Sequence, residues 1–120
     1  MASDSLAFAL LRAAEAIASV IAGHNLDAGL GACWQAHDIS PGQRGAVQDL
    51  AYGTLRQFGR GDFLLAQLLR SPLQEAQGNS AARLQRALLL AALYRLETHP
   101  AAAHTTVDQA VHASACIDQG

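Results

Sequence analysis

The stretch AARLQRALLLAALYRLE, residues 81–97, limits the possible folds of this chain more than any other part of it. Its last ten residues are apolar nearly all round a helical wheel, and the preceding Ser80 is a suitable N-cap. A helix without a broad polar face is stable only when other elements surround it. The composition agrees, because alanine and leucine dominate while β-branched and aromatic residues are few. We therefore predict an all-α bundle with this helix at its centre.

Hydrophobic periodicity and capping signals predict five further helices. They cover residues 5–22, 26–37, 41–58, 63–70 and 103–117. Six helices fit one domain, because 120 residues suffice for a single core but not for two. In the last helix the apolar stripe predicts that Val107, Ala110, Val111 and Ile117 face inward.

Local motifs place some of the helix ends. Ser40 is a good N-cap, and Gln43 completes an S-x-x-Q capping box. The GRGD segment, residues 59–62, is predicted to be a tight turn in which Asp62 caps the next helix. Pro72 then closes that helix, because the residue before a proline is disfavoured in helical geometry.

Gly53 stands inside a predicted helix, where glycine costs roughly 1 kcal/mol relative to alanine. It falls away from the buried stripe that contains Val47, Leu50 and Phe58, so it does not fill the main core. A glycine here has two possible explanations: a second helix packs closely against it, or the backbone of a ligand does. We favour helix packing.

The arginines are the strongest functional candidates. All eight basic residues are arginine, which binds phosphate and carboxylate well, although a GC-rich genome would give the same bias. A formal charge of −2 argues against coating of nucleic acid by bulk electrostatics. The candidate anion contacts are Arg56, Arg60, Arg83, Arg86, Arg44 and Arg12. The alternative is that these arginines only solvate the bundle and pair with Asp49, Asp62, Glu75 and Glu97.

Other kinds of site find little support in the sequence. We expect no catalytic set, because the serines and cysteines lack a plausible neighbouring base. The five histidines show neither an i, i+4 pair nor a CxxC partner, so we expect no metal site. Cys33 and Cys116 read as small buried hydrophobes of a reduced protein. We expect no membrane span and a cytoplasmic location.

Several motifs occur in an order and spacing that resemble a known family. They are Tyr52-Gly53-Thr54-Leu55-Arg56, Pro72-Leu73, Tyr94, Pro100 and Val107-Asp108-Gln109-Ala110-Val111. In this order the chain resembles the NusB-like helical domain. More narrowly, it resembles the version at the N-terminus of RsmB-type ribosomal RNA cytosine-5 methyltransferases. Each motif alone is weak, but together they cover nearly the whole chain.

The resemblance implies an all-helical, RNA-binding domain that spans residues 1–120 as one unit. It further implies that the domain helps to engage small-subunit (16S) ribosomal RNA for a separate catalytic domain. That catalytic domain would bind S-adenosylmethionine and methylate cytosine, and this chain would need no cofactor. The alternatives are a stand-alone antitermination factor and a protein-docking module in which the arginines meet a partner's carboxylates.

Two departures from the family pattern modify this expectation. The first predicted helix offers only Arg12, whereas the antitermination factors tend to open with an arginine-rich helix. The sequence also stops at ACIDQG, where the family continues into a further helix. We therefore expect an N-terminal fragment of a longer methyltransferase that lacks the family's last helix. Apolar surface exposed in this way could make the fragment a homodimer.

Overall fold

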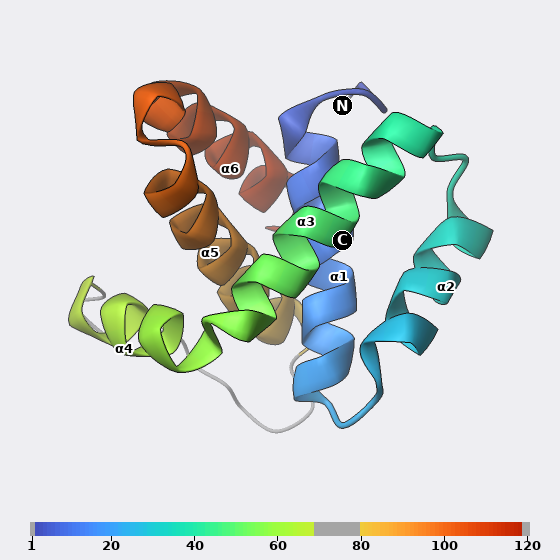
Figure 1. Cartoon of the computed structure of the whole chain (residues 1–120), viewed down its shortest axis with the longest axis horizontal. Coiled ribbons are helices and arrows are strands. Elements are labelled where there is room, and N and C mark those ends of the chain that lie inside the picture. Colours follow the sequence, from blue (N-terminus) through green and yellow to red (C-terminus); the bar gives the residue numbers. More distant parts are fainter. Residues whose placement is uncertain (1, 69–79, 119–120) are drawn as a thin grey trace.

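The computed structural model describes residues 2–68 and 80–118, which form helices and their connections (Figure 1). The helices are α1 (Leu6–Ile21), α2 (Leu26–Ala36), α3 (Pro41–Arg56), α4 (Phe58–Leu68), α5 (Ser80–Thr98), the short 3₁₀ helix η1 (Pro100–Ala102) and α6 (Ala103–Asp118). The described residues contain no strand. The all-α prediction with six helices is confirmed. The predicted stop at Pro72 and the loop before α5 lie outside the described residues.

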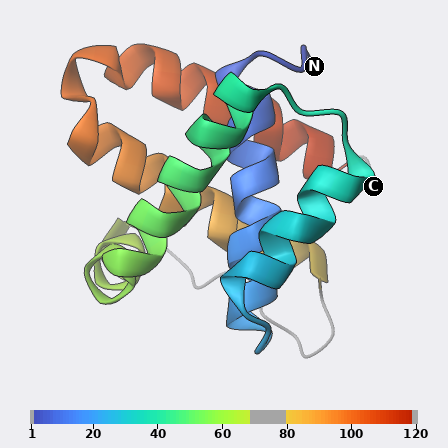
Figure 2. The ribbon, with the colours of Figure 1, turned by 45° about the vertical axis from the view of Figure 1, so that its right-hand side comes forward.

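Helix α1 occupies the centre of the bundle and packs against α2, α3, α5 and α6. In Figure 1, α3 crosses in front of α1 and α2 lies to one side of it, and the turned view of Figure 2 brings α2 in front of the C-terminal part of α1. Alanine makes this close packing possible, because a small side chain lets helix axes approach. Five alanines of α1 are at most 1% exposed, namely Ala7, Ala9, Ala13, Ala14 and Ala16. The central position predicted for α5 is thus shared with α1.

Side-chain caps fix the starts of the first three helices. Ser5, Asn25 and Ser40 each accept a hydrogen bond from the backbone amide three residues later. The Gln43 side chain, however, donates to the carbonyls of Ser3 and Ser5. The predicted capping box is therefore half formed, and its glutamine ties α3 to the N-terminal segment.

The GRGD prediction is wrong, because these four residues lie inside α4. The chain turns earlier, at Gln57, whose φ of −107° and ψ of 23° end α3. Contacts with α5 hold the segment in helical form. Arg60 pairs with Glu97, and a Cβ on Gly61 would lie 3.4 Å from Leu90. Asp62 faces Arg86 of α5 and does not cap a helix.

The orientation predicted for α6 is also partly wrong. Ile117 is buried as expected, but Val107 and Val111 are 52% and 65% exposed. Their places in the core are taken by Thr106 and Ala113, which have no exposed surface. The two valines instead line an apolar groove of about 370 Å³ between α4, α5 and α6. The expected homodimer stays a prediction.

Gly53 lets two helices approach each other. It is buried, and a Cβ at this position would overlap the ring of Tyr94 on α5. The Tyr94 hydroxyl donates to Asp49, one turn earlier on α3, at 3.2 Å. Of the two explanations for this glycine, helix packing is therefore confirmed.

Candidate nucleic-acid interface

The six candidate arginines do not form one patch. Arg44 lies in the first turn of α3, and Arg56 is its last residue. Arg60 is on α4, Arg83 and Arg86 are near the start of α5, and Arg12 is on α1. They also differ in how exposed they are and in which carboxylates or rings they contact.

Arg56 is the candidate most open to a ligand. It is exposed at the C-terminal end of α3 and has no ion-pair partner among the residues that the structure describes. Burial and then the Asp49 carboxylate raise the pKa of Tyr94, and the positive charge of Arg56 opposes that rise. A guanidinium in this position can contact a phosphate without first breaking an ion pair.

Arg44 is exposed and partly fixed. Its guanidinium carbon lies 5.1 Å from the centre of the Trp34 ring on α2, within the range of a cation–π contact. Its Nε donates to the carbonyl of Ile39 at 3.2 Å. These two contacts hold the side chain in one direction, while the terminal nitrogens have no bond to another described residue.

Arg60 and Arg86 both join α4 to α5. Arg60 donates from Nη2 and Nε to one Glu97 oxygen at 2.7 and 3.0 Å. Arg86 pairs with Asp62 and lies over the Phe58 ring. The alternative that arginines pair with Asp62 and Glu97 is thus confirmed for these two. A phosphate would have to compete with a carboxylate at either site.

Arg83 lies on another side of the bundle. It is half-buried and lines a cavity of about 340 Å³. Glu15, Ser19 and His24 of the α1 end also line this cavity. Arg83 therefore lines a cavity that neither Arg56 nor Arg44 lines.

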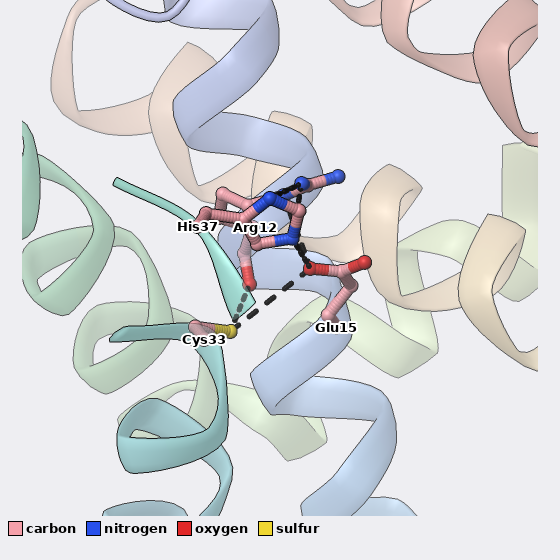
Figure 3. A network of polar contacts seen from close by, with 4 residues as sticks. All are labelled: Arg12, Glu15, Cys33 and His37. Atoms are coloured by element: carbon pink, nitrogen blue, oxygen red, sulfur yellow. Dashed lines mark hydrogen bonds and ion pairs between the residues drawn. The ribbon is translucent and has the colours of Figure 1, made fainter. Parts of the chain in front are cut away.

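Arg12 is part of the core and does not lie on the surface. It is 8% exposed, and its guanidinium lies 2.6 Å from Nε2 of His37, at the end of α2 (Figure 3). It also lies 3.0 Å from Glu15 and over the Phe8 ring. A buried charge needs such partners to be stable. Arg12 thus fastens α2 to α1, and we leave it out of the interface.

Cys33 belongs to the same network. Its thiol donates to the carbonyl of Arg12 at 3.5 Å (Figure 3). Burial, and then the charge of Glu15, raise the pKa of Cys33 to about 11. The thiol is therefore protonated at neutral pH and is not a nucleophile. Cys116 is only half-buried, so the prediction of two buried cysteines holds fully for Cys33 alone.

Two aromatic residues of this region were not predicted from the sequence as site residues. Trp34 is covered on one side by Arg44, and Tyr52 on α3 is 44% exposed. The Tyr52 hydroxyl donates to Asp27 at 3.3 Å, and the charge of Asp27 raises the pKa of Tyr52. The sequence analysis names Tyr52 only as part of the family motif. Its spacing of four residues from Gln48 and Arg56 would have placed all three on one helix face.

Other site types find no support in the described part of the chain. No three side chains of histidine, cysteine, aspartate or glutamate come close enough there to hold a metal ion. None of the described helices combines the length and the apolarity that crossing a membrane requires. What the arrangement offers is a set of guanidinium groups on helix surfaces, which suits anion binding.

Comparison with known proteins gives two matches. The sequence profile of the NusB family matches residues 6–119. Ribosomal RNA small subunit methyltransferase B of Pseudomonas putida is 37% identical over 110 residues. This alignment covers 91% of the present chain but 23% of the relative, so the chain spans about a quarter of that protein's length. No solved structure shows significant similarity.

Proposed function

The chain belongs to the NusB family, and from this premise we propose that it is the non-catalytic, RNA-engaging N-terminal domain of a 16S ribosomal RNA cytosine-5 methyltransferase. The observation that carries the proposal is the 37% identity over 91% of the chain to a protein named as a ribosomal RNA methyltransferase. The proposed partners are small-subunit ribosomal RNA and the protein's own catalytic domain. The proposed location is the cytoplasm.

In this proposal the chemistry takes place outside the present residues. The catalytic domain would bind S-adenosylmethionine, which supplies the methyl group. The buried thiol of Cys33, with its pKa raised to about 11, fits a structural role rather than attack on a base. The half-buried Cys116 likewise has no assigned role in catalysis.

The contribution of this domain is to hold RNA by a small number of phosphate contacts. Arg56 is the first candidate, because it is exposed and free of ion pairs with described residues. Arg44 is the second, since Trp34 and Ile39 orient it. With a net charge of −2, such binding should be weak and sensitive to salt.

The experiment that tests the proposal is a fluorescence-anisotropy titration with a labelled hairpin of small-subunit ribosomal RNA. We expect the wild-type chain to bind at about 50 mM salt and to lose most of its affinity at about 200 mM. Arg56→Ala should weaken binding, while Arg56→Lys, which keeps the charge, should retain most of it.

Gln67→Ala is the neutral control, because Gln67 is exposed on α4, away from the helix that carries Arg44 and Arg56. The absence of binding by a folded wild-type chain at low salt would overturn the proposal. The domain would then serve only to dock the catalytic domain.

A further inference from the structure

Four exposed side chains form a row along α3 that winds around the helix axis by about 40° at each step. Arg44, Gln48, Tyr52 and Arg56 follow each other at four-residue spacing, and all four are exposed. Residues four apart lie on successive turns of one helix face. At 1.5 Å per residue the row is about 18 Å long. We call these four residues the α3 stripe. In Figure 1, α3 crosses the front of the molecule and no other helix lies over it.

The α3 stripe has guanidinium groups at its two ends and an aromatic ring between them. At one end, Arg44 lies against the Trp34 ring. At the other end, Arg56 has no ion-pair partner among the described residues. Tyr52 is held at the edge of its ring by the hydroxyl bond to Asp27, and 44% of its surface is open to solvent. Gln48 adds an amide that both donates and accepts hydrogen bonds.

We propose that the α3 stripe binds a short single-stranded segment of RNA, with a base stacked on Tyr52 and phosphates at Arg44 and Arg56. The inference rests on the proposed function and specifies the form of RNA and the residues that read it. Base stacking on exposed aromatic rings, with arginines along the backbone, is the usual chemistry of single-strand recognition. In duplex RNA the bases are already stacked on each other, so the ring would have no free face to contact.

The exposed Tyr52 ring of the α3 stripe favours this partner over an acidic protein, although carboxylates lie beside it. Asp27 bonds to Tyr52, and Asp49 bonds to Tyr94 within one turn of the stripe. These carboxylates would repel an acidic peptide and the phosphates of RNA alike. A nucleotide gains from stacking as well as from its phosphate contacts, so it tolerates neighbouring carboxylates better.

The first test uses a labelled single-stranded oligonucleotide copied from a small-subunit ribosomal RNA loop. Tyr52→Ala should weaken its binding at least about fivefold, the lower end of the stacking range. Tyr52→Phe keeps the ring and loses only the bond to Asp27, so it should bind like the wild type. The matched control is Phe63→Ala, which removes a 65% exposed ring from α4 and should change nothing.

The second test uses Trp34, which is the only tryptophan of the chain and lies beside Arg44. Its fluorescence should change on addition of the oligonucleotide and saturate at the dissociation constant that anisotropy gives. An abasic oligonucleotide with the same number of phosphates should bind more weakly than the normal one. Equal binding of the two would show recognition of charge alone and would overturn the inference.

The outcomes separate the two proposals. If RNA binds but Tyr52→Ala and the Trp34 signal show no effect, the α3 stripe is not the site and the proposed function stands. If neither hairpin nor single strand binds the folded chain, both proposals fail. Circular dichroism of each variant shows whether a loss of binding reflects a loss of fold.

Discussion

At the level of single residues, Gly53 shows how a position that weakens a helix can strengthen a bundle. The glycine costs helix propensity, but it opens the space into which the Tyr94 ring packs. The packing contact outweighs this cost, because the Tyr94 ring then connects α5 to α3 and its hydroxyl donates to Asp49.

Gly53→Ala should therefore destabilise the fold by about 1–3 kcal/mol, since the added methyl group displaces the ring. The measurement is urea unfolding followed by circular dichroism. Gly45→Ala is the matched control on the same helix, where a Cβ meets nothing within 4 Å. It should stabilise the chain by up to about 1 kcal/mol. A neutral Gly53→Ala variant would mean that Tyr94 does not pack against this position.

The raised pKa of Cys33 predicts that its thiol reacts slowly. Its pKa is raised from 9.0 to about 11, so the thiolate fraction at pH 8 should be about a hundredfold lower than for an ordinary thiol. Iodoacetamide should accordingly modify Cys116 well before Cys33, as mass spectrometry of the peptides would show.

The raised pKa of Cys33 also sets the sign of a stability change. The neutral thiol stabilises the fold fully below the unfolded pKa of 9.0, and this contribution is lost as pH rises through about 11. Cys33→Ala should flatten that part of the pH dependence. Faster labelling of Cys33 than of Cys116 in the folded chain would contradict both statements.

The arginines show where prediction from sequence stops at this scale. Their side-chain chemistry could be read from the sequence, but their partners depend on which helices meet. Arg12 looks like a polar residue beside an apolar stripe, and only the docking of α2 buries it against His37. Arg56 and Arg60 are both arginines and lie four residues apart. Of these two, only Arg60 forms an ion pair with a described carboxylate, that of Glu97.

At the level of elements, α4 shows local preference overruled by packing. Two glycines and an aspartate in four residues are typical of a turn. The structure keeps them helical because Arg60 and Asp62 pair with α5 and Gly61 fits closely against Leu90. None of these partners is near in sequence, so the sequence alone could not reveal them.

The two ion pairs of α4 should differ in their effect on stability. Arg60 is 65% exposed, and Arg60→Ala should give no measurable change in unfolding. The Arg86 side chain is 21% exposed and also lies over Phe58, so Arg86→Ala should cost about 1–2 kcal/mol. Paired denaturant titrations of the two variants measure the difference. A larger loss for Arg60→Ala would contradict this description of the α4–α5 contact.

The orientation of α6 can be tested in the same way. Val111 is 65% exposed in the groove, so Val111→Ser should change the free energy of unfolding by less than about 0.5 kcal/mol. Ile117 is 9% exposed and packs in the core, so Ile117→Ala should cost about 2 kcal/mol or more. A large loss for Val111→Ser would instead support the inward position that the sequence predicted for Val111.

At the level of the whole molecule, the fold class and most helix bounds were predictable because periodicity and caps are local signals. The central position of α1 was not predictable, because it depends on how the alanine-lined surface of α1 fits against four neighbouring helices. The candidate site was predictable only in its residue type. Arg56 and Arg44 are the candidates that the structure leaves exposed and without a carboxylate partner among the described residues.

The proposed binding of RNA depends on direct contacts between phosphates and α3. The most direct test is the slope of log K against log salt for the single-stranded ribosomal RNA segment, measured for the wild type and for Arg56→Ala. Each phosphate contact on a single strand contributes about 0.7 to this slope. We predict that the variant's slope is shallower by about 0.7. Equal slopes would mean that Arg56 touches no phosphate, and a wild-type slope of zero would contradict direct RNA binding altogether.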